Sequence, residues 1–113
     1  MTGLAYAGAV ISVIGGILGL LFPRRVGSVI GLALPSTLGV SEVRATYGGL
    51  FLGAGIAVLV LGSSDAALVL GVAWSGAFAA RAVSAVVDRS WSKENFAGLV
   101  IEAAVGFLLV VGR

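Results

Sequence analysis

The sequence contains no cysteine and no histidine, and only 11% of its 113 residues are charged. Without thiols or imidazoles the chain forms no disulfide, attaches no haem through cysteine and lacks the usual zinc ligands. We therefore expect no metal site and no cofactor. We also expect no enzymatic activity, because the candidate nucleophiles are ordinary serines with no obvious base beside them. The few basic residues are scattered, which argues against a nucleic-acid partner.

Apolar residues make up 59% of the chain, and its mean hydropathy is +1.16. A soluble domain carries charge on roughly a quarter of its residues, so this composition favours a bilayer. We predict one all-α domain over residues 1–113, a bundle of four transmembrane helices at about residues 4–22, 43–61, 66–87 and 93–111. The first run could be a cleaved signal peptide, but it has no basic start and is longer than a typical signal core, which favours a span.

The segment between the first two spans is too short to cross a membrane. Residues 24–34 are predicted to form a short interfacial helix lying on the bilayer surface. A re-entrant segment is the alternative, which Gly27 and Gly31 would permit. Ser41 is the expected N-cap of the second span, with Glu42 in its first turn where the helix dipole favours an acid.

Small residues are arranged for close helix packing. The first span has a stripe at three- and four-residue spacing, formed by Gly8, Ser12, Gly15, Gly16 and Gly19. The second span contains a GxxxG pair, Gly49 and Gly53, for which packing within the monomer is the default interpretation and homodimerisation the alternative. The tight turn at 62–65 predicts that spans two and three are antiparallel neighbours.

Two charges lie deep inside the apolar runs. Arg81 is roughly 9 Å from the end of the third span, and Glu102 is about 12–14 Å from the start of the fourth, so both lie in the same half of the bilayer. A charge facing lipid at that depth costs a few kcal/mol or more, so we expect the two to point inward and pair. Arg44 and Tyr47 could complete the cluster.

Two interpretations of this cluster remain open. It could be a closed salt bridge that fixes helix register while Arg44 snorkels to the headgroups. It could instead be a binding site, because two arginines and one inner glutamate leave a positive excess suited to a lipid headgroup or a small anion. Glu42 and Asp88 would lie at the mouth of the cluster. The candidate residues for ligand binding or a buried charge network are Arg44, Tyr47, Trp74, Arg81, Asp88 and Glu102.

Three stretches together resemble a known family. They are EVRATYGGLFLGAGIAVLVLG (42–62), GAFAARAVSAVVD (76–88) and the late Glu102. This pattern resembles a bacterial family of small four-helix membrane proteins of unknown function, domain-of-unknown-function family 4345. The matching positions are Arg44, Gly48, Gly49, Arg81, Asp88 and Glu102. The resemblance implies an integral membrane bundle with a charged pocket, in the bacterial inner membrane, and it supplies no assigned reaction.

Two functions follow from these expectations. The first is a non-catalytic membrane protein that binds a lipid or small anionic molecule, or serves as an accessory subunit of a larger membrane complex. Membrane lipids are the expected partners, and the protein could also form a homo-oligomer. The alternative is a small proton-coupled multidrug-type transporter, which the chain resembles in length; Glu102 would then carry the proton. Basic residues in the first and third loops place both chain ends outside by the positive-inside rule; these are Arg24, Arg25, Arg89 and Lys93.

Overall fold

Four long helices dominate the computed structural model, which describes residues 1–113. They are α1 (Gly3–Leu21), a continuous helix made of α3 (Thr37–Val43), η1 (Arg44–Leu50) and α4 (Phe51–Leu61), then α5 (Ser64–Val87) and α6 (Lys93–Gly112). Each of the four is long and apolar enough to cross a membrane, and a short helix, α2 (Pro23–Val29), lies between the first two. The predicted all-α architecture is confirmed.

The second long helix begins earlier than predicted. Ser36 is its N-cap, and the Ser36 hydroxyl accepts a hydrogen bond from the Gly39 amide at 3.3 Å. Ser41, expected to be the cap, lies inside α3. The expectation was wrong because an equivalent serine five residues earlier, just after Pro35, already satisfies a free amide of the first turn.

The short helix is briefer than the predicted 24–34. It ends at Val29, and Gly31 follows with a positive φ of 76°, a conformation that side chains with a Cβ rarely adopt. The Leu32 amide then donates to the Gly27 carbonyl at 2.8 Å, which turns the chain back toward α3. The residues after Val29 therefore form a turn and an extended connection rather than more helix.

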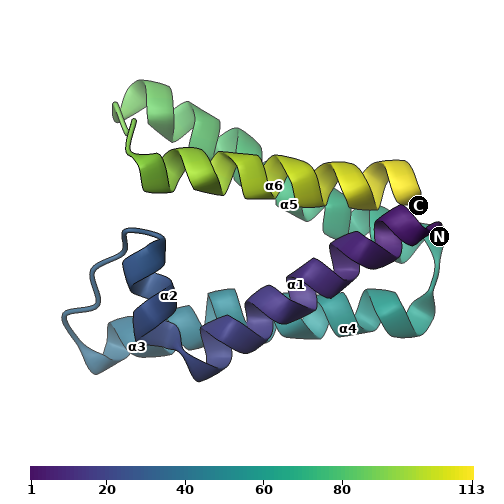
Figure 1. Ribbon diagram of the computed structural model, residues 1–113, viewed down its shortest axis with the longest axis horizontal. Helices are drawn as coiled ribbons and strands as arrows, with labels where there is room; N and C mark the ends of the chain where they lie inside the picture. The colour runs from purple at the N-terminus through teal and green to yellow at the C-terminus, as the bar shows by residue number, and fades with distance from the viewer.

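The helices form two arms that meet at one end and diverge toward the other (Figure 1). One arm is α1 packed on η1 and α4, and the other is α5 packed on α6. The arms join where the chain ends meet, because the Thr2 amide and hydroxyl both donate to the Gly112 carbonyl, at 2.6 and 2.9 Å. Although α4 and α5 are joined by a tight turn, α5 packs mainly on α6.

Small residues bring α1 against the second long helix, as the stripe predicts. A Cβ on Gly16 would clash with the backbone of Leu52, and one on Gly48 would lie 2.8 Å from the Leu20 amide nitrogen. Ser12 is fully buried in the same contact, and its hydroxyl donates to the Phe51 carbonyl at 3.0 Å. The two backbones therefore touch along this arm, which only small side chains allow.

The GxxxG pair does not pack within the monomer. A Cβ on Gly53 would meet nothing within 4 Å, and one on Gly49 would meet only the Arg44 carbonyl of its own helix, at 3.8 Å. The glycines that face α1 are Gly48, one residue before Gly49, and Gly55, two residues after Gly53. The default interpretation of the motif was wrong because the face of the helix that meets α1 is rotated away from Gly49 and Gly53.

The apolar core lies at the closed end of the arms. Its buried residues come from all four long helices and are Ala5, Ala9, Val58, Ala67, Leu70, Val105 and Leu109. Their burial holds the arms together at the end where the chain termini lie (Figure 1). Because the cluster shared by all four helices lies at that end, the halves of the arms beyond it are free to diverge.

Candidate functional site

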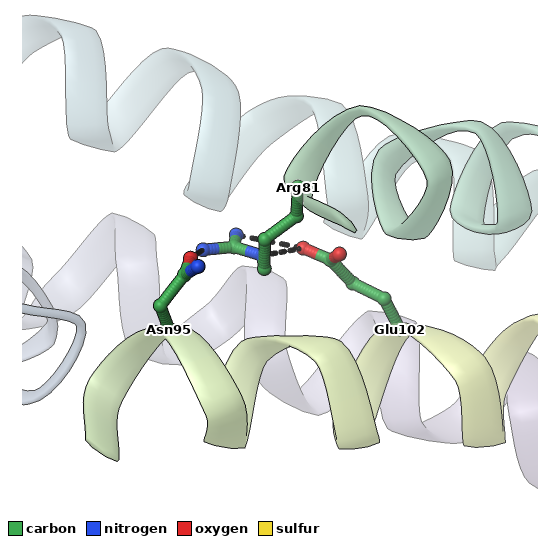
Figure 2. Close-up of polar contacts among 3 residues, drawn as sticks. All are labelled: Arg81, Asn95 and Glu102. Carbon is green, nitrogen blue, oxygen red and sulfur yellow. Dashed lines mark hydrogen bonds and ion pairs between the residues drawn. The ribbon is translucent and has the colours of Figure 1, made fainter. Parts of the chain in front are cut away.

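An ion pair between α5 and α6 forms the centre of the candidate site. The Arg81 Nε and Nη2 atoms both donate to Glu102 Oε1, at 2.9 and 2.7 Å, and Nη1 donates to Asn95 Oδ1 at 3.0 Å. Figure 2 shows the guanidinium held between Asn95 and Glu102, which rise from one face of α6. The predicted pairing of Arg81 with Glu102 is confirmed.

The local sequence of α6 makes room for this guanidinium. Asn95, Gly98 and Glu102 recur at three- and four-residue spacing and so share one face of the helix. A Cβ at Gly98 would lie 2.7 Å from Arg81 Cζ and 2.8 Å from Nε, which shows that the guanidinium rests directly on the α6 backbone. Asn95 is itself held, since its Nδ2 donates to the Ser90 carbonyl at 2.8 Å.

The pair is only partly satisfied by the protein. The Glu102 side chain is 8% exposed, and its second oxygen, Oε2, is buried without a hydrogen-bond partner. The Arg81 side chain is 27% exposed and uses three of the five N–H groups that a guanidinium carries. One acceptor and two donors therefore remain at a site where an unpaired polar group is costly.

The ion pair borders a cleft of about 390 Å³ between the two arms. Arg81, Gly98, Ile101 and Glu102 line it from α5 and α6. The opposite wall is apolar and belongs mainly to α1 and α2, where the lining residues are Ile11, Ile14, Gly15, Leu18, Val26 and Ile30. The cleft thus combines a long apolar surface with one small polar area.

Aromatic rings line the cleft where the two arms touch. Tyr47 packs edge-on against Phe51 with ring centroids 5.6 Å apart, and Phe51 packs against Trp74 at 4.7 Å. All three residues line the cleft, so Tyr47 and Trp74 of the predicted site lie in the same cavity as Arg81 and Glu102. Trp74 comes from α5 and Phe51 from α4, and their contact joins the arms beside the cavity.

Two predicted residues lie outside this group. Arg44 Nη1 donates to the Leu20 carbonyl at the end of α1, and Arg44 lines a different hollow. Residues 44–50 form a π-helix, whose wider turn rotates less per residue and so separates the direction of Arg44 from that of Tyr47. Asp88, exposed after the end of α5, accepts a hydrogen bond from Ser84 Oγ at 2.7 Å. Glu42 forms no ion pair.

The site also contains residues outside the predicted set. Asn95 and Gly98 belong to the Arg81 contact, and their spacing from Glu102 was the sequence signal that could have identified them. Phe51 had no such signal, because its direction depends on the π-helix before it. With Arg44 elsewhere, Arg81 and Glu102 balance each other in charge, and the expected positive excess is absent from the cleft.

The polar groups of the cleft are few and come mainly from three of its lining side chains. The cleft contains a carboxylate and a guanidinium that are bound to each other, a tyrosine and apolar side chains. Comparisons of the chain with protein-family models, with curated proteins and with solved structures found no match. The function is therefore inferred from the geometry of this site.

Proposed function

We propose that this protein is a non-catalytic integral membrane protein that binds a lipid or lipid-like small molecule in the cleft between its arms. The observation that carries the proposal is that the Arg81–Glu102 pair, whose carboxylate keeps one oxygen without a partner, lines a mostly apolar cavity. A guest with a polar end and an apolar body would satisfy both parts of the cavity. Its volume, about 390 Å³, is in the range of small-molecule sites.

The free hydrogen-bonding groups favour an uncharged polar end. A hydroxyl or amide both donates and accepts, so it suits a pair in which one carboxylate oxygen and two guanidinium N–H groups have no protein partner. A carboxylate or phosphate would use only the arginine and would bring a second negative charge close to Glu102. The neutral pair therefore supports a long-chain alcohol, amide or similar molecule over the small anion expected from the sequence.

The apolar wall supports entry from the bilayer. Ile11, Ile14 and Leu18 of α1 and Ile101 of α6 line the cleft and are also substantially exposed. In a membrane these exposed side chains contact acyl chains, so an apolar guest can move into the cleft without crossing water. The bacterial inner membrane as the location, and membership of the domain-of-unknown-function family 4345, are proposals that depend on the sequence resemblance.

A fluorescence experiment tests the binding site directly. The chain has two tryptophans, and Trp91→Phe would leave Trp74, which lines the cleft, as the single reporter. We expect a brominated long-chain alcohol to quench Trp74 saturably in detergent, with the corresponding fatty acid, ionised at neutral pH, binding more weakly. Quenching that rises without saturation, or equal binding of both probes, would contradict the proposal.

Two glycine variants provide a matched pair for this assay. A Cβ at Gly15 or at Gly53 meets nothing within 4 Å, but only Gly15 lines the cleft. Gly15→Leu should fill the cavity and abolish saturable quenching, whereas Gly53→Leu should leave it unchanged. Unchanged binding in Gly15→Leu would place the probe elsewhere on the protein.

A proton-coupled transporter is the second candidate function, and the half-satisfied buried carboxylate of Glu102 is the observation in its favour. Against it, protonating Glu102 would leave the Arg81 guanidinium without its counter-charge. Reconstituted vesicles loaded with a pH-sensitive dye separate the two functions. A binding protein produces no proton flux when the alcohol probe is added, whereas a proton-coupled transporter does.

A further inference from the structure

Three arginines gather at a second hollow, at the corner between α1, α2 and the second long helix. Arg24 and Arg25 of α2 and Arg44 of η1 line this basic hollow, which has a volume of about 270 Å³. No acidic residue lines it, and the only ion pair in the structure is the distant Arg81–Glu102 pair. Three uncompensated guanidinium groups around one hollow are the arrangement expected for an anion site.

Arg44 is fixed at the edge of the basic hollow. Its Nη1 donates to the carbonyl of Leu20, in the last turn of α1, where carbonyls have no partner within the helix. This contact leaves other N–H groups of the guanidinium free and limits the motion of a long side chain. Part of the entropy cost of ordering Arg44 around a guest is thereby already met by the fold.

An apolar hollow of about 340 Å³ adjoins the basic one. It is lined by Leu18 and Phe22 from the end of α1 and by Val26, Val29 and Ile30 from the α2 segment, with Arg25 at its edge. Phe22 and Arg25 line both hollows, so a molecule with a charged head and an apolar chain could occupy the two together. The basic part and the apolar part are placed as a phospholipid at a membrane surface requires.

We propose that the two hollows bind one anionic phospholipid. Its phosphate lies between Arg24, Arg25 and Arg44, and one acyl chain lies against Phe22 and Val26. The planar fork of arginine suits a phosphate, and basic residues between helices on the cytoplasmic side are typical of sites for anionic headgroups. The headgroup part of this site is separate from the cleft, because Arg24 and Arg44 line only the basic hollow, whereas the apolar hollow and the cleft share Leu18, Val26 and Ile30.

The test is a titration of the full protein with phosphatidylglycerol in a neutral detergent, with bound lipid counted by native mass spectrometry. Each basic residue near anionic lipid contributes about fivefold in affinity, so Arg24→Gln/Arg25→Gln should weaken binding by roughly 25-fold. The matched control, Arg89→Gln/Lys93→Gln, removes the same charge from the connection after α5 and the first residue of α6, outside the hollow. It should leave the affinity within about twofold of the original, because neither residue lines the basic or the apolar hollow.

Further comparisons separate the alternatives. Equal loss in the two double variants, or equal binding of phosphatidylcholine, would overturn the proposal in favour of general attraction. Displacement of the lipid by inorganic phosphate at the concentration that works for a short-chain phosphatidylglycerol would overturn the role of the apolar hollow. Arg44→Gln retains a donor for the Leu20 carbonyl, so it should stay folded while losing about fivefold in affinity.

The cleft variant provides an independent control. Gly15 lines the cleft but neither of the two hollows at α2. Gly15→Leu should therefore abolish binding of the alcohol probe and leave phosphatidylglycerol binding unchanged. Loss of lipid binding in this variant would place the lipid in the cleft and overturn the proposal.

Discussion

Replacing Gly98 with alanine is the sharpest test of the geometry at the ion pair. The added methyl carbon would lie 2.7 Å from Arg81 Cζ, 2.8 Å from Nε and 3.0 Å from Nη1. Carbon atoms in contact normally lie about 3.5–4.0 Å apart, so the guanidinium must retreat by roughly 1 Å. Its present hydrogen bonds measure 2.7–3.0 Å, and such a movement would lengthen at least two of them beyond bonding distance.

The cost of this movement can be estimated from the bonds lost. Each hydrogen bond to a charged group contributes about 1.5 kcal/mol or more, so two lost bonds cost about 3 kcal/mol. Alanine is favoured over glycine inside a helix by about 1 kcal/mol, which opposes the loss. We therefore expect Gly98→Ala to lower the free energy of unfolding by about 2 kcal/mol.

The matched control is Gly76→Ala in α5, where an added Cβ meets nothing within 4 Å. This variant should be unchanged or more stable by up to about 1 kcal/mol, since only the helix preference acts. Reversible unfolding of both variants in mixed detergent micelles, followed by circular dichroism, measures the difference. If Gly98→Ala is as stable as Gly76→Ala, the guanidinium does not lie on the α6 backbone and the described site is wrong.

Three further predictions follow from other contacts. Arg81→Met and Glu102→Met should each lower the free energy of unfolding by about 3 kcal/mol, because each leaves a charge unpaired. The double variant should lose less stability than the two single variants together, and additive losses in a double-mutant cycle would contradict the ion pair. Ser12→Ala should cost about 0.6 kcal/mol through the lost bond to the Phe51 carbonyl. The comparison is Ser84→Ala, at a half-buried serine whose hydroxyl donates to the exposed Asp88, and an equal effect of both would contradict the role of the Ser12 bond. Reporters fused to the N-terminus and to the C-terminus should lie on the same side of the membrane, because the Thr2–Gly112 contact joins the two ends. The positive-inside rule predicts that both ends lie outside the cell. Reporters on opposite sides would refute the four-span topology.

Part of the site could be derived from the sequence because helix periodicity is local. The positions of Arg81 and Glu102 along their spans followed from counting residues, and the cost of exposing a charge to lipid required that they meet. The stripe containing Gly16 and Gly19 likewise followed from the spacing of small residues along a single helix. Such inferences need only the pitch of a helix and the properties of the surrounding solvent.

Other features depend on how the helices are rotated and splayed. Arg44 was expected with Arg81, yet the π-helix over residues 44–50 directs it to the end of α1 and Tyr47 to the cleft. The GxxxG pair was expected to pack, yet Gly48 and Gly55 occupy the contact with α1. Rotating a helix about its axis by the angle of about one residue is enough to move Arg44 out of the cleft or to replace Gly49 by Gly48 at the contact. The sequence pattern does not fix that rotation.

The sequence alone therefore indicated a bilayer as the surroundings of the helices, four helices long enough to span it, and the two residues of the buried ion pair. It did so because hydrophobic length and the cost of burying charge are properties of each segment in turn. Only the tertiary structure decided that the arms diverge, that Oε2 of Glu102 is left without a partner, and that Arg24, Arg25 and Arg44 share one hollow. Those outcomes depend on which faces of separate helices meet, because backbone contact at small residues selects one packing among many that the pattern permits.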